Sequence, residues 1–237
     1  MTAAPSPKIK ARIRKCGVVA VVPAAGYGKR LGLKVKKPFV LLGGKPLVVH
    51  ALKALNGCSA IDAIIVAAER PCVDDIKKLA ARYRIGKLAS VVAGGKTRFE
   101  SVRNCLEIIP ASCEVVVIHD GARPLVEKRL IEDSIRLAKK FGACIVAVPE
   151  SDTVKLVGND LFTKKTLDRS CIFRAQTPQA FRAGLIKKAY SLRGKYNVTD
   201  DASLVESAGK RVKILAGSYR NMKITTKEDL KFAEVLI

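Results

Sequence analysis

Several features are scarce or missing in this chain of 237 residues. It has no tryptophan, and aromatic residues make up only 5% of it, so few rings are available for stacking nucleic-acid bases. No apolar run reaches the ~20 residues that a membrane-spanning helix needs. The N-terminus also lacks the apolar segment of a secretory signal. We therefore predict a protein that is neither membrane-spanning nor secreted, and expect it to be cytoplasmic.

The seven cysteines include no CxxC pair and no nearby histidine at the spacing of a zinc site. Their number is odd, and several lie in apolar runs or at the ends of predicted elements. Disulfides belong to oxidising compartments, whereas a reduced cysteine packs like a small apolar residue. We interpret all seven as reduced core residues.

Acidic residues are few: the chain has 21 aspartates and glutamates but 44 lysines and arginines, which gives a formal net charge of +23. Residues 1–15 carry five of the cations and no acid, and we predict a flexible basic tail there. Most of the positive charge lies outside this tail. Such a field attracts anions of any kind, so a basic nucleic-acid-binding protein is the alternative from another class. The cations are scattered over nearly every predicted helix, which favours a solvated surface over a binding groove.

The most informative stretch is VVAVVPAAGYGKRLGLKVKKPFV, residues 18–40. A β-branched apolar run of this kind is typical of a buried strand. It breaks at Pro23 into small residues that let backbone N–H groups approach a ligand closely. Five cations follow, among them Lys29, Arg30, Lys36 and Lys37. The stretch indicates a cradle for a polyphosphate.

Three better-known glycine or serine motifs do not fit. In a dinucleotide fingerprint counted from Gly26, the sixth position is Leu31 rather than glycine. Gly28-Lys29 is followed by Arg30 rather than the serine or threonine of a P-loop. No GxSxG elbow of a serine hydrolase occurs.

Alternating apolar runs and helical patterns predict an α/β fold with a mostly parallel sheet and helices on both faces. Strands are expected at 61–68, 88–93, 114–118, 143–148 and 211–215, besides the one that begins at Val18. Helices are expected from Pro46 to just before Gly57, at 71–83, up to Ile108, at 130–141, 183–192 and 200–207, and at the C-terminus, capped by Thr225 with Glu228 three residues on. Two short strands at 153–157 and 161–167 form an arm, about 151–175. The chain returns from the arm through Thr177-Pro178-Gln179. We predict a single domain, 16–237, with this arm.

Ligands of such sheets bind at the carboxyl ends of the strands, so the small-residue loop, Gly94-Gly95 and His119-Asp120 should meet at one edge. Asp120 is the strongest candidate, because a carboxylate facing a triphosphate suits Mg²⁺; the alternative is a turn or helix-cap aspartate. Arg123 either clamps a phosphate or pairs with Asp120, and His119 is expected to be a packing residue. Of Asp200 and Asp201, capping explains at least one.

Together these motifs resemble the 2-C-methyl-D-erythritol 4-phosphate cytidylyltransferase family of the non-mevalonate isoprenoid pathway. The resemblance runs from about Val18 to the C-terminus. It rests on an ordered set of segments: PAAGYGKRL, the lysine before Phe39, GGKTRFESV, VIHDGARP, SDTVK, LDRS, QTPQAF, VTDDAS and NMKITTKEDL. The family implies a Rossmann-like nucleotidyltransferase fold and transfer of a cytidylyl group from CTP to methylerythritol phosphate, releasing pyrophosphate.

The resemblance also implies roles for particular residues. CTP would lie over Ala24, Ala25, Gly26 and Gly28, with its base read near Ala24, Gly95 and Ser101 and its ribose near Gly121. Arg30 and Lys37 would hold the α-phosphate, and Asp120 would bind Mg²⁺. The acceptor would be positioned by Arg123, Thr153, Arg169, Thr177 and Lys223. The family further implies a homodimer in which the arms embrace, so that Thr153 and Arg169 serve the partner's site.

The sequence departs from the family pattern at two positions. Lys36 stands where proline usually precedes the catalytic lysine, with Pro38 after it. Either lysine could take the role, and register against Phe39 favours Lys37. Lys96 replaces a residue that is often acidic, which adds a cation near the nucleotide. The nearest competing enzyme is ribitol 5-phosphate cytidylyltransferase, which the sequence separates only weakly.

Overall fold

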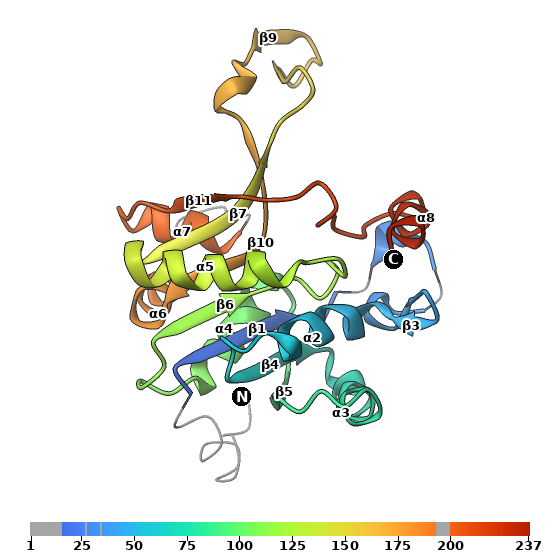
Figure 1. The fold of residues 1–237 in the computed structure, drawn as a ribbon. Helices are drawn as coiled ribbons and strands as arrows, with labels where there is room; N and C mark the ends of the chain where they lie inside the picture. Colours follow the sequence, from blue (N-terminus) through green and yellow to red (C-terminus); the bar gives the residue numbers. More distant parts are fainter. Residues whose placement is uncertain (1–15, 27, 34, 193–199) are drawn as a thin grey trace.

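The computed structural model describes residues 16–26, 28–33, 35–192 and 200–237. The predicted tail, 1–15, lies outside the described residues. One seven-stranded sheet organises the chain, in the order β11-β7-β10-β6-β1-β4-β5 (Figure 1). All its strands run parallel except β10 (Phe173–Arg182), which pairs antiparallel with both of its neighbours. The mostly parallel α/β sheet is confirmed. No described helix combines the length and the apolar character needed to cross a membrane.

The central strands are the apolar runs of the sequence. They are β1 (Val18–Pro23), β4 (Ala63–Ala68), β5 (Leu88–Ala93), β6 (Val115–Ile118) and β7 (Ala143–Pro149), with β11 (Lys213–Ala216) at one edge. Alternate side chains of β1 face opposite sides. Ala20 and Val22 pack toward α2 (Leu47–Gly57), α3 (Val73–Arg82) and α5 (Lys128–Phe141). Val19 and Val21 pack toward α4 (Arg98–Ile108), α6 (Ala183–Ser191) and α7 (Asp201–Ser207). A strand covered on both faces needs a continuous apolar run.

A smaller cluster joins the segment between β1 and α2 to the C-terminal part of the chain. Leu31, Val40 and Leu42 pack with Ile224 and with Ala233 of α8 (Lys227–Leu236). The segment between β1 and α2 carries two short 3₁₀ turns, η1 (Lys29–Leu31) and η2 (Lys37–Phe39), and a two-stranded ribbon of β2 (Leu41–Leu42) and β3 (Lys45–Pro46). This cluster holds the segment that carries η1 and η2, which we call the cationic segment, near the edge of the sheet.

The arm is an antiparallel hairpin of β8 (Lys155–Val157) and β9 (Thr163–Thr166), followed by the 3₁₀ turn η4 (Arg169–Cys171). It projects away from the sheet (Figure 1). Every residue of β8 and β9 is exposed, as are the side chains of Leu161 and Phe162 at the tip.

One segment takes a form that the sequence left open, and two sequence expectations are wrong in detail. The return from the arm is part of the ten-residue strand β10; the pairing register shifts between Ala175 and Gln179, and such an irregularity accommodates Pro178 inside a sheet. The C-terminal helix is capped by Thr226 with Asp229, one residue later than expected, because the Asp229 carboxylate accepts the backbone N–H of Thr226. Cys171 is exposed on the arm, whereas the other six cysteines are buried.

Candidate functional site

The loops that follow β1, β5 and β6 surround a cavity of about 220 Å³ at the carboxyl edge of the sheet. Parallel strands deliver the loops at their carboxyl ends to the same edge, which is why segments far apart in sequence meet here. The cavity is lined by Pro23, Ala24, Ala25, Gly26, Lys37, Pro38, Gly95, Lys96, Thr97, Arg98, Ser101, Asp120, Gly121, Ala122 and Lys223.

Small residues are needed where the loops after β1 and β5 meet. A Cβ placed on Gly94 would lie 2.5 Å from the Cβ of Ala25, closer than real side chains approach. The Ser101 hydroxyl accepts the Gly95 N–H at 3.1 Å and donates to the Thr97 carbonyl at 2.9 Å. Thr97 and Glu100 form a capping box at the start of α4. The backbone of one wall of the cavity is therefore held rigidly.

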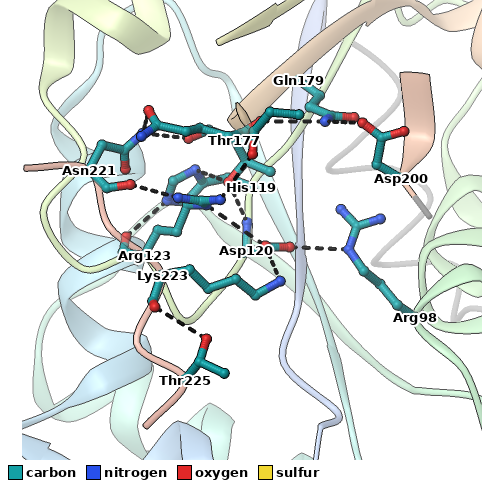
Figure 2. A network of polar contacts seen from close by, with 12 residues as sticks. Arg98, His119, Asp120, Arg123, Thr177, Gln179, Asp200, Asn221, Lys223 and Thr225 are labelled. Atoms are coloured by element: carbon teal, nitrogen blue, oxygen red, sulfur yellow. Dashed lines mark hydrogen bonds and ion pairs between the residues drawn. The ribbon is translucent and has the colours of Figure 1, made fainter. Parts of the chain in front are cut away.

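Asp120 is a nearly buried carboxylate surrounded by cations (Figure 2). Its Oδ2 lies 2.7 Å from Lys223 Nζ, and its Oδ1 accepts a hydrogen bond from Arg98 Nε at 3.1 Å. Arg123 Nε lies 3.9 Å from Oδ2. Burial raises the pKa of Asp120, but Arg98, Lys223 and Arg123 outweigh it and hold the pKa well below its usual range. The carboxylate is therefore ionised throughout the physiological pH range.

On the side away from the cavity, a buried polar network holds Asp120 in place, as Figure 2 shows. The Thr177 hydroxyl accepts the Asp120 N–H at 3.0 Å and lies 3.0 Å from His119 Nδ1. Arg123 donates to the carbonyl of Asn221 at 2.6 Å, and Asn221 donates to the carbonyl of Thr177 at 2.8 Å. Burial lowers the pKa of His119 to about 4, so its ring is neutral at pH 7. His119 is a packing residue, as expected.

Arg98 is a functional candidate that the sequence reasoning missed, and its partner Asp201 was considered there only together with Asp200, for helix capping. Arg98 lines the cavity and joins Asp120 to Asp201, whose Oδ2 lies 2.7 Å from the guanidinium. Asp201 is fully buried and also accepts the Tyr190 hydroxyl, while Asp200 caps α7 as expected for one of the two acids. The one available signal was the basic Arg98 directly after a helix cap. Its partner Asp201 is 103 positions away in the sequence, so no local pattern could indicate the pairing.

The two adjacent lysines point to different places. Lys37 lines the cavity and is half-buried, whereas Lys36 forms an ion pair with Glu69 outside the cavity lining. Burial, followed by the charge of Lys223, lowers the pKa of Lys37 from its ordinary value to about 8, with Asp120 opposing. A Cβ on Gly28, whose φ is +66°, would lie 2.8 Å from the Cβ of Lys37. Glycine is therefore needed at position 28, because any side chain there would collide with the side chain of Lys37.

The other predicted site residues lie outside the cavity lining. Arg30 is exposed on η1, though near enough for its charge to lower the pKa of Lys37. Arg123 and Thr177 stand behind Asp120 in the polar network. Thr153 and Arg169 are exposed on the arm, where Arg169 donates to the carbonyl of Ser151 at 2.8 Å. Within one copy of the described chain, these two do not join the rest of the predicted site.

The metal-binding capacity of the site is limited to what Asp120 offers. Among the described residues, no group of three or more His, Cys, Asp or Glu side chains is placed to hold a metal ion. Mg²⁺ often needs only one or two protein carboxylates when substrate phosphates and water complete its octahedron. Asp120, ionised and at the cavity wall, fits a Mg²⁺ ion that arrives with a polyphosphate.

Comparisons with known proteins agree with this geometry. The family model for 2-C-methyl-D-erythritol 4-phosphate cytidylyltransferase matches residues 18–237. A relative of that name from Pelotomaculum thermopropionicum is 43% identical over 224 residues, covering 93% of this chain and 94% of the relative. Another, from Geobacillus thermodenitrificans, is 46% identical over 223 residues, covering 92% and 96%. The crystal structure of 4-diphosphocytidyl-2C-methyl-D-erythritol synthase from Anaerococcus prevotii matches with a TM-score of 0.84 at 33% identity, covering 95% of this chain and 98% of that one.

Proposed function

Since the chain belongs to the 2-C-methyl-D-erythritol 4-phosphate cytidylyltransferase family, we propose that the cavity at its sheet edge is the catalytic site. The protein transfers a cytidylyl group from CTP to 2-C-methyl-D-erythritol 4-phosphate, a step of isoprenoid precursor biosynthesis. The products are 4-diphosphocytidyl-2-C-methyl-D-erythritol and pyrophosphate. The observation that carries the placement is the convergence of Lys37, Asp120 and Lys223 on a cavity walled by small residues.

CTP binds with its base beside Gly95 and Ser101 and its ribose near Gly121. The Ala24 N–H donates to the Ala67 carbonyl and the Gly95 N–H to the Ser101 hydroxyl, so the carbonyls of Ala24 and Gly95 are the groups that would accept the amino group of cytosine. Uracil presents the opposite pattern at that edge, so a pocket matched to cytosine leaves polar groups unpaired with uracil. The phosphates extend over Ala25, Gly26 and Gly28 toward Lys37.

In the reaction an oxygen of the acceptor phosphate attacks the α-phosphorus of CTP. A new P–O bond forms there, the bond from the α-phosphorus to the α–β bridging oxygen breaks, and pyrophosphate leaves with that oxygen. Arg30 and Lys37 stabilise the charge that gathers on the α-phosphate oxygens. Such transfers depend mainly on positioning and on charge neutralisation.

Asp120 would hold a Mg²⁺ ion that arrives with the triphosphate. When bound, Mg²⁺ would supply neutralisation of phosphate charge. In the structure, Lys223 Nζ lies 2.7 Å from Asp120 Oδ2, and the Lys223 side chain is 39% exposed. With a cation bound at Asp120, Lys223 would contact the acceptor phosphate with its long side chain.

The acceptor site is completed by a second copy of the chain. An isolated two-stranded hairpin is only marginally stable in water, yet this arm exposes Leu156, Val157, Leu161 and Phe162. In the homodimer we propose, residues 16–237 form one domain whose arm packs against its partner. Thr153 and Arg169 then reach the partner's acceptor site, beside Lys223, Arg123 and Thr177.

A coupled assay of pyrophosphate release tests the function directly. Purified protein is supplied with Mg²⁺ and CTP, and with either 2-C-methyl-D-erythritol 4-phosphate or ribitol 5-phosphate. Only the first acceptor is expected to support rapid release. Equal or faster release with ribitol 5-phosphate would overturn the acceptor assignment while leaving cytidylyl transfer intact.

A further inference from the structure

Lys36 makes a specific contact on the outer side of the cationic segment. Its Nζ lies 2.6 Å from Glu69 Oε2 and 3.3 Å from Cys72 Sγ. Glu69 directly follows β4, the neighbour of β1 in the sheet, and its side chain is only 12% exposed. Cys72 lies in the 3₁₀ turn η3 (Arg70–Cys72) and is buried. Lys36 therefore attaches the cationic segment to the end of a core strand.

The attachment bears directly on the position of Lys37. Lys36 has extended backbone, with φ −62° and ψ 137°, and its carbonyl accepts the Phe39 N–H at 2.9 Å. Residues 36–39 thus form one closed turn, in which Lys36 directly precedes the 3₁₀ turn η2 and Lys37 is its first residue. Lys36 points to Glu69 while Lys37 points into the cavity, and Pro38 contacts both sides. Fixing Lys36 consequently fixes where the Lys37 ammonium lies.

We propose that Glu69 is a positioning residue of the transfer reaction: through Lys36 it anchors the 36–39 turn and so holds Lys37 at the α-phosphate. We call the contact between Lys36 and Glu69 the latch. Glu69 also lines a groove beside Ala25, Gly26 and Gly28, and the proposal assigns its effect to the turn rather than to contact with substrate. The inference rests on the proposed role of Lys37. A loosened turn lets the Lys37 ammonium leave its place, and such misplacement lowers kcat because the charge is not preorganised where the transition state develops.

The latch and simple electrostatics predict different effects of Glu69→Gln on the reaction. Glu69→Gln removes a negative charge near a site for polyanions, which by simple electrostatics favours CTP. Lys36→Met removes a positive charge, which disfavours it. Loss of the latch instead lowers kcat in both variants. Partly exposed ion pairs contribute little energy, so we expect a fall of about three- to tenfold in each.

The experiment compares Glu69→Gln, Lys36→Met and the double variant by pyrophosphate release, with kcat and KM determined separately. The double variant should fall no further than the worse single variant, because both remove one interaction. KM for the acceptor should stay within about twofold. Lys36→Arg should retain near wild-type kcat, since a guanidinium also bonds a carboxylate. As a matched control, Lys77→Met breaks the exposed Lys77–Asp74 pair on α3 and should leave kcat unchanged.

Amide hydrogen exchange supplies a readout that is independent of catalysis. The Phe39 amide, bonded to the Lys36 carbonyl, should exchange faster in Glu69→Gln and in Lys36→Met, with the melting temperature of both variants near that of the wild type. Wild-type kcat and unchanged Phe39 exchange in Glu69→Gln would overturn the latch. Lys37→Ala is measured in parallel. If Lys37→Ala is fully active, the proposed role of Lys37 fails, and the catalytic role of the latch fails with it even where exchange is faster.

Discussion

The lowered pKa of Lys37 gives the reaction a predicted alkaline limit. Lys37 stabilises phosphate charge only in its protonated form, and burial together with Lys223 brings its pKa to about 8. A group with this pKa is about nine-tenths protonated at pH 7 and about one-tenth at pH 9. The dependence of kcat/KM on pH reports ionisations of the free enzyme. We therefore expect kcat/KM for CTP to be about tenfold lower at pH 9 than at pH 7.

Measuring initial rates of pyrophosphate release from pH 6.5 to pH 10 tests this limit. Phosphate groups of the substrates lose their last protons near pH 6, below the range in question. Lys37→Arg supplies the control, because a guanidinium stays charged beyond pH 12. The alkaline fall should vanish or move far upward in this variant, and even low residual activity suffices to locate it. A fall near pH 8 that persists in Lys37→Arg would refute the assignment to Lys37, as would a flat wild-type profile up to pH 10.

Three further predictions concern the same site. Lys37→Ala should lower kcat by ~10²–10³, the scale for losing one preorganised charge-stabilising group, while Lys36→Ala stays within the milder range expected for the latch; the reverse order would show that Lys36 is the catalytic lysine. CTP should be strongly preferred over UTP, and comparable kcat/KM values for the two would contradict the cytosine-reading arrangement. Mixing nearly inactive Lys37→Ala with nearly inactive Arg169→Ala under subunit exchange should restore roughly a quarter of wild-type activity, because in half of the dimers one of two sites carries neither defect; no recovery despite confirmed exchange would show that the arm serves its own subunit.

The sequence was informative wherever a local pattern has a direct physical cause. Apolar runs such as 88–93 became buried or half-buried strands, because a strand covered by helices on both faces admits few polar side chains. The sequence also predicted which edge of the sheet carries the site, because parallel strands place their carboxyl ends together. Gly94-Gly95 and Asp120 were therefore predicted to meet, and the structure brings both to the cavity.

What the sequence left open depended on contacts between distant residues. Register against Phe39 favoured Lys37 over Lys36, but only the fold shows how they differ: Glu69, which follows β4, binds Lys36, while Lys37 lines the cavity. The strand character of 173–182 was hidden because Pro178 signals a break, whereas pairing with β6 and β7 on both sides overrides it.

The chain by itself thus determined the layered fold, the edge of the sheet where chemistry takes place and the residue types that gather there. These follow from hydrophobic periodicity and from turn chemistry, which act over a few residues. The tertiary structure decided which cation faces the cavity, that Arg98 joins Asp120 to Asp201, and that Asp120 is ionised despite its burial. Those outcomes depend on desolvation and on charges brought together from separate segments, and neither exists until the chain has folded.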